Sequence, residues 1–134
     1  MSKIIAVDFD GTLCEECWPG IGPAKKEVIE YVKRQKADGA RLILWTCRCG
    51  KELEAAVAWS REQGIEYDAV NKNLPCVVKA FGGSDCRKVV ADEYLDDRAL
   101  LPGSLGSGQK GNRRLTSAYA ARNGTRNREK ESEQ

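Results

Sequence analysis

Short apolar runs alternate with longer amphipathic segments, and this alternation limits the fold more than any other feature of the chain. Each apolar run is too short to be a helix by periodicity alone, and each ends in polar residues. We therefore predict four strands, at Ile4–Phe9, Arg41–Thr46, Tyr67–Val70 and Glu93–Asp96.

Two helices are predicted between the first three strands, at Pro23–Lys36 and Lys51–Gln63. Each has apolar residues at the spacing that places them on one face of a helix. Pro23 suits a first helical turn, and Gly39 and Gly64 stand where a left-handed residue often ends a helix.

This order of strands and helices predicts an α/β fold, Rossmann-like, with three layers, a parallel sheet and right-handed crossovers. Ligands of such sheets bind beyond the carboxyl ends of the strands. The polar residues that follow each strand are therefore expected to meet at one edge of the sheet.

Length and composition favour one folded domain over residues 1–102. The chain has 134 residues, of which 41% are hydrophobic, enough for a single core. It has no apolar run of membrane-spanning length and no secretory signal, so we expect a cytoplasmic protein without a membrane partner. The six cysteines are then expected to be reduced. Cys14-Glu15-Glu16-Cys17 and Cys47-Arg48-Cys49 are weak evidence for zinc, because the chain has no histidine to complete a mixed site.

The last segment, Gly103–Gln134, is polar and is predicted to be mostly disordered. It has seven Lys or Arg against three Glu, so its net charge is +4, and residues 1–102 have −2 of the total of +2. Nucleic-acid binding through this basic tail is a less favoured alternative, because the tail lacks interleaved aromatic residues.

The first predicted strand ends in two aspartates, Asp8 and Asp10, and Gly11 follows them. Residues i and i+2 of a regular strand share a face, so these carboxylates repel each other unless a cation or a proton intervenes. A hard divalent metal is a natural occupant of such a pair. Taken alone, the pair fits an acidic strand end equally well.

The run Lys3–Leu13, an apolar strand followed by Asp-Phe-Asp-Gly-Thr, closely resembles the first motif of haloacid dehalogenase superfamily phosphatases. The resemblance implies that Asp8 is the nucleophile and Asp10 the general acid/base. It implies a magnesium ion bound by the Asp8 carboxylate and the Asp10 main-chain carbonyl, with Thr12 supporting the turn.

The second and fourth motifs of that superfamily have counterparts at the ends of two other predicted strands. Thr46 is expected to donate a hydrogen bond to a phosphoryl oxygen. Arg48 is placed to add a forked donor to substrate phosphate, and an exposed loop arginine is an equally good interpretation. In the fourth motif, Asp97 is expected to contact the metal directly or through water, and Asp96 to orient it or add an outer contact.

The third motif requires a lysine that offsets the charge of nucleophile and phosphate. Lys72, Lys79 and Lys88 lie between the third and fourth predicted strands. Ser84–Arg98 resembles a subgroup of small capless members with an Arg-Lys pair before the acidic pair, so Lys88 is preferred and Lys79 is second. Lys88 fits only if the fourth strand is short and the chain bends near Asp92. Solvated surface lysines are the alternative.

The resemblance therefore implies a magnesium-dependent phosphomonoester hydrolase that acts through an aspartyl-phosphate. Only Leu13–Gly22 separates the first motif from the first helix, so no large cap domain is expected. An open site suits a bulky phosphorylated substrate, or a small one enclosed by a partner subunit of a homo-oligomer. A non-catalytic phosphate- or partner-binding module is the alternative. Family members usually add a strand after the acidic pair, but Arg98–Pro102 leads into the tail, which leaves open whether an edge strand is missing.

Overall fold

The computed structural model describes residues 2–106, so nearly all of the predicted disordered tail lies outside the described residues. A first compact unit ends at Asp96, and a second begins at Asp97. The described part of the second unit contains a short 3₁₀ helix at Pro102–Ser104. None of the described helices is long and apolar enough to span a membrane.

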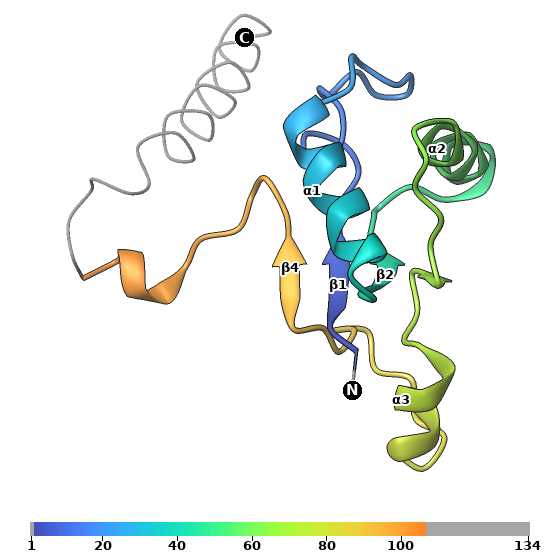
Figure 1. Ribbon diagram of the computed structural model, residues 1–134, viewed down its shortest axis with the longest axis vertical. Helices are drawn as coiled ribbons and strands as arrows, with labels where there is room; N and C mark the ends of the chain where they lie inside the picture. The colour runs from blue at the N-terminus through green and yellow to red at the C-terminus, as the bar shows by residue number, and fades with distance from the viewer. Residues whose placement is uncertain (1, 107–134) are drawn as a thin grey trace, which may run out of the picture. The chain divides into compact units, whose positions relative to one another are not determined.

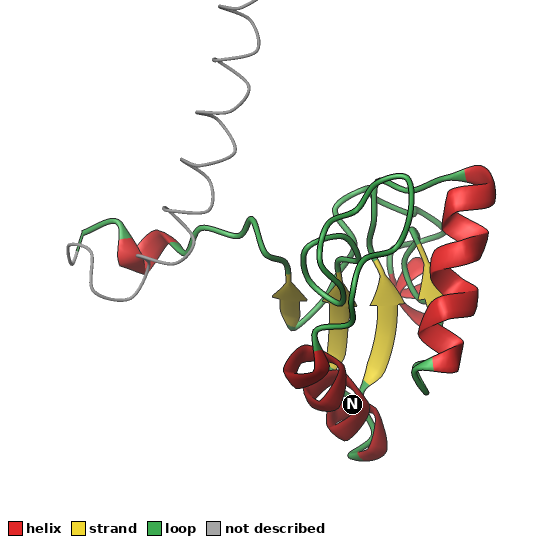
Figure 2. Cartoon of the chain, turned by 90° about the horizontal axis from the view of Figure 1, so that it is seen from above, coloured by secondary structure: helices red, strands yellow, loops and turns green. Residues whose placement is uncertain are grey.

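Four parallel strands form one sheet in the order β3-β2-β1-β4, which confirms the predicted parallel sheet (Figures 1 and 2). All four predicted strands are present, and each is one or two residues shorter than predicted. The strands are β1 (Ile4–Val7), β2 (Arg41–Leu44), β3 (Ala69–Val70) and β4 (Glu93–Leu95).

Three helices connect the strands, α1 (Lys26–Ala37), α2 (Gly50–Glu62) and α3 (Pro75–Ala80). The first two confirm the predicted helices. Gly39 and Gly64 follow them with φ angles of +98° and +88°, the left-handed conformation in which glycine is favoured. The sequence interpretation missed α3 because six residues are too few for a periodic pattern, although Pro75 in its first turn was a usable signal.

Apolar side chains of the strands alternate between the two faces of the sheet, so each face has a core of its own. The larger core contains Ile5 and Val7 of β1 together with Val32 of α1 and Ala56 of α2. The smaller core, on the other face, contains Ala6, Ile43, Ala69, Leu74 and Val89, with Val77 of α3 packed against it. Helices thus cover both faces, and the three-layer α/β fold is confirmed.

The strand order reverses beside β1. The chain passes from β1 through α1 to β2 and through α2 to β3. The connection that contains α3 then returns it to β4, on the other side of β1. The carboxyl ends of β1 and β4 therefore flank a topological switch point, the usual place for a ligand in an open α/β sheet.

The amino end of β4 is anchored by polar contacts. Asp92 and Ile4 are joined by two hydrogen bonds of 2.7 Å, one from each backbone amide. The Tyr31 hydroxyl of α1 donates to Glu93, and Lys3 forms a 2.7 Å ion pair with the same carboxylate. Hydrogen bonding from Lys3, then from Tyr31, lowers the pKa of Glu93. Within residues 2–106 no strand follows β4, so the described sheet lacks the additional edge strand.

Candidate active site

Asp8 lies directly beyond β1, next to the end of β4. Its backbone amide donates to Leu95 at 2.9 Å, so the β1–β4 ladder continues to this residue. The hydroxyl of Thr12, a buried residue, donates to Asp8 Oδ2 at 3.0 Å. Thr12 therefore orients the Asp8 carboxylate directly, whereas we predicted only that it supports the turn.

The turn after β1 separates the two aspartates of the pair. Gly11 has φ +83°, and its amide donates to the Cys14 carbonyl at 2.9 Å. Phe9, between the two aspartates, is fully buried and packs edge-on against Trp59 of α2, with ring centroids 5.5 Å apart. Because Phe9 anchors the turn in the core, Asp8 and Asp10 have different partners.

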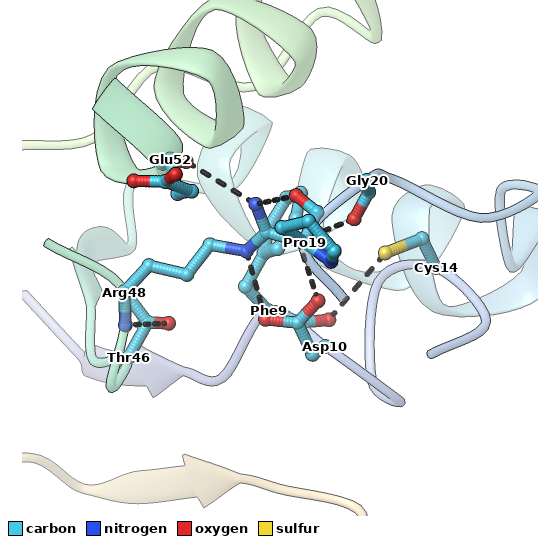
Figure 3. A network of polar contacts seen from close by, with 8 residues as sticks. All are labelled: Phe9, Asp10, Cys14, Pro19, Gly20, Thr46, Arg48 and Glu52. Carbon is cyan, nitrogen blue, oxygen red and sulfur yellow. Dashed lines mark hydrogen bonds and ion pairs between the residues drawn. The ribbon is translucent and has the colours of Figure 1, made fainter. Parts of the chain in front are cut away.

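Arg48 provides the partner of Asp10, and this contact is the most elaborate polar arrangement in the site (Figure 3). Its Nε and Nη2 donate to the two Asp10 carboxylate oxygens at 2.8 and 2.7 Å. Nη2 also donates to the Gly20 carbonyl at 2.6 Å, and Nη1 donates to the carbonyls of Pro19 and Glu52 at 3.2 and 3.3 Å. All five N–H donors of the guanidinium thus have acceptors within the protein.

The Arg48 guanidinium is also enclosed by aromatic rings. Its central carbon lies 4.9 Å from the Phe9 ring centroid and 5.0 Å from that of Trp18, and the residue is 2% exposed. Hydrogen bonding to Asp10 raises the pKa of Arg48, although burial acts in the opposite direction. The predictions for Arg48 are corrected by this geometry. The residue is not an exposed loop arginine, and its donors are not available to a substrate phosphate.

Thr46 follows β2 at the same edge of the sheet. Its amide donates to Asn71 Oδ1 at 2.8 Å, and its hydroxyl oxygen accepts the Arg48 amide at 3.1 Å. Since the hydroxyl acts as acceptor in that bond, its proton can be donated to a phosphoryl oxygen. Asn71 was missed by the sequence interpretation, and its left-handed conformation, with φ +52°, could have been suspected only from the residue type.

Carboxylates gather at the switch point. Oxygens of Asp8 and Asp96 lie within 4.8 Å of each other, and Asp97, the next residue in the chain, supplies a third acid of the same group. Carboxylate oxygens at this spacing suit a hard divalent cation such as magnesium. The Asp10 carboxylate is engaged by Arg48, so the predicted contact between Asp10 and the metal depends on the main-chain carbonyl.

The three candidate lysines occupy different parts of the fold. Lys72 follows β3 at the carboxyl end of the sheet, and Lys79 lies in α3. β4 is short, as the choice of Lys88 required, but the Lys88 ammonium lies 5.6 Å from the ring of Tyr94, which pairs with Ala6 within the ladder. Lys72 is thus the candidate that lies just beyond a strand end, and the choice among the three lysines stays a prediction.

One cation near the first motif was not expected from the sequence. Lys25, just before α1, donates from its ammonium to the Gly11 carbonyl at 2.5 Å and so stabilises the turn that follows Asp10. Cys14 also contacts this turn, because its buried thiol donates to the Phe9 carbonyl at 3.9 Å. All six cysteines are free thiols, and burial raises the pKa of Cys14. Among the described residues, the candidate metal-binding group contains no cysteine.

Comparison with known proteins gives one relevant similarity. No protein-family model and no curated protein matches the sequence. A solved structure, that of a conserved protein from Bacteroides thetaiotaomicron, matches with 39% sequence identity and a TM-score of 0.65. The match covers 75% of this chain and 79% of the other chain.

Proposed function

We propose that this chain, which belongs to the same family as the conserved Bacteroides thetaiotaomicron protein, is a magnesium-dependent phosphomonoester hydrolase of the haloacid dehalogenase superfamily. The observation that carries the proposal is the meeting of Asp8 and Asp96 at the switch point, within 4.8 Å. The resemblance implies that Asp8, in the first motif, is the nucleophile and that Asp96, in the fourth, orients Asp97 at the metal or adds an outer contact. The two residues come from opposite ends of the folded sequence.

Asp8, Asp96 and Asp97 would hold the magnesium ion, whose charge offsets that of the phosphoryl group. An Asp8 oxygen attacks the phosphorus atom, and the bond to the ester oxygen breaks as an aspartyl-phosphate forms. In this scheme Asp10 supplies the proton that the leaving oxygen needs. The Thr46 hydroxyl donates to a phosphoryl oxygen during the transfer.

A water molecule completes the cycle by attacking the phosphorus of the aspartyl-phosphate. Asp10 accepts the water proton, the bond between phosphorus and the Asp8 oxygen breaks, and inorganic phosphate leaves with Asp8 restored as a carboxylate. Thr12, which donates to Asp8 Oδ2 at 3.0 Å, keeps the nucleophile oriented. The free thiols are in keeping with the cytoplasmic location that we propose.

The proposal is tested by assaying the full chain against a panel of phosphomonoesters that includes sugar, nucleoside, amino-acid and aryl phosphates. We expect magnesium-dependent release of phosphate from at least one class. Excess EDTA should remove the activity, and magnesium added beyond the chelator should restore it, because the ligands are carboxylates without a cysteine or histidine cage. Activity that survives EDTA would disprove the metal site. Failure across the whole panel would favour the non-catalytic module.

The phosphate-facing lysine is tested by comparing Lys72→Met, Lys79→Met and Lys88→Met. We expect Lys72→Met to lower kcat most, by about 10²–10³-fold, the usual cost of removing one donor to a developing anion. Lys88→Met should have a small effect, because the Lys88 ammonium lies against Tyr94. A large loss in Lys88→Met with a normal Lys72→Met would restore the original choice.

A further inference from the structure

The segment between the first motif and α1, residues 15–22, is tied to the candidate site by Arg48. The carbonyls of Pro19 and Gly20 accept from the same guanidinium that binds Asp10. The Trp18 ring covers that guanidinium at 5.0 Å. One buried side chain thus connects this segment with the residue assigned to proton transfer.

The hydrogen bonds fix the orientation of the Asp10 carboxyl group. Both of its oxygens accept an N–H of Arg48, at 2.8 and 2.7 Å, the two-point geometry in which a guanidinium binds a carboxyl group. Each oxygen keeps a further lone pair that can accept a proton from water. The pairing therefore suits the second half of the proposed reaction, in which Asp10 is a base.

We propose that Arg48 is a positioning residue, which holds Asp10 as the base for hydrolysis of the aspartyl-phosphate and fixes residues 15–22 around it. This inference rests on the proposed function. In the step concerned, a water oxygen bonds to phosphorus, the water proton moves to Asp10 and the bond between phosphorus and Asp8 breaks. Arg48 contacts neither phosphate nor water, since its five donors are bound within the protein.

The kinetic test uses 4-nitrophenyl phosphate, whose leaving group departs as a stable anion. Phosphorylation of Asp8 by this substrate does not need an acid, whereas hydrolysis of the intermediate needs the base. In Arg48→Lys we expect kcat to fall about 10-fold or more, and the fraction of enzyme trapped as aspartyl-phosphate by acid quench to rise. Mass spectrometry of the quenched protein measures that fraction. Lysine keeps the charge but not the fork that binds two oxygens.

A merely structural role for Arg48 predicts the opposite change in the intermediate. Both half-reactions would then slow together, the trapped fraction would stay level or fall, and the positioning role would be overturned. Arg61→Met is the matched control, because Arg61 is 69% exposed and has a long ion pair of 3.8 Å with Glu66. We expect it to retain the turnover and trapped fraction of the unmodified protein.

Amide hydrogen exchange provides a second measurement that does not depend on activity. In Arg48→Lys, and more strongly in Arg48→Met, residues 15–22 should exchange about 10-fold faster, while β1 and β2 keep their protection. Unchanged exchange in residues 15–22 would overturn the link between Arg48 and this segment. If exchange rises but the unmodified protein hydrolyses no phosphomonoester, the proposed function and the kinetic role of Arg48 both fail, and only the structural link stands.

Discussion

Asp8→Asn is expected to abolish phosphatase turnover and to leave the fold intact. The amide is a poor nucleophile and cannot form the aspartyl-phosphate, so we expect kcat to fall by about 10⁴-fold or more. The fold should persist because asparagine has the same shape, and its amide oxygen can still accept the Thr12 hydroxyl that now donates to Asp8 at 3.0 Å. Phosphate release and the circular-dichroism thermal transition measure the two effects.

Asp38→Asn is the matched control for this variant, because it makes the same chemical change at an exposed residue after α1. We expect normal turnover there. Full activity in Asp8→Asn would disprove the nucleophile assignment, whatever the control shows. Loss of the thermal transition in Asp8→Asn would instead mean that the carboxylate is needed for folding, and the aspartyl-phosphate would then have to be sought in the unmodified protein.

Arg48→Met is expected to lower the free energy of unfolding by about 3–5 kcal/mol, the usual cost of removing one partner from a buried ion pair. The Arg48 side chain is 1% exposed and that of Asp10 21%, so water cannot fully replace the lost donors. Methionine fills part of the volume but leaves Asp10 and the carbonyls of Pro19 and Gly20 without these partners. Urea unfolding followed by circular dichroism measures the change.

Two further variants show how much of this loss comes from the ion pair between Arg48 and Asp10. Arg61→Met should change the free energy of unfolding by less than about 1 kcal/mol, as is usual for an exposed ion pair. The double variant Arg48→Met with Asp10→Asn should lose less free energy of unfolding than the two single variants added together. Each single variant leaves one charge without its partner, whereas the double variant removes both charges. If Arg48→Met were as stable as the Arg61→Met control, the guanidinium would contribute little net energy to this part of the fold.

The sequence predicted the fold and the edge of the sheet at which the candidate site lies, because both depend on local patterns. Alternation of strands and helices indicated the parallel sheet, and the polar ends of β1 and β4 indicated Asp8 and Asp96. These features follow from residue type and spacing, which a single sequence contains. The missed α3 was too short to show a pattern of its own.

The contacts of individual cations could not be predicted in the same way. Arg48 follows a strand end in a polar loop, where an arginine is usually exposed, yet it bends back to Asp10 and becomes 2% exposed. Its acceptors on Pro19 and Gly20 are backbone carbonyls, which have no sequence signature. The position of Lys88 against Tyr94 likewise depends on the course of an irregular connection. Long polar side chains reach partners that spacing along the chain does not reveal.

The pairing of β4 with β1 also determines when the candidate site can form as the chain folds. The hydrogen bond from Ile4 to Asp92 joins residues 88 positions apart, and Asp8 and Asp96 meet through the same pairing. Contacts of such long range are costly to close in an unfolded chain. The first three strands can pair before β4 has been synthesised, but the acidic edge cannot exist until β4 is added. Under the proposed function, a nascent chain that ends before Asp96 would contain Asp8 without the complete group of carboxylates, and phosphatase activity would begin only with the last strand in place.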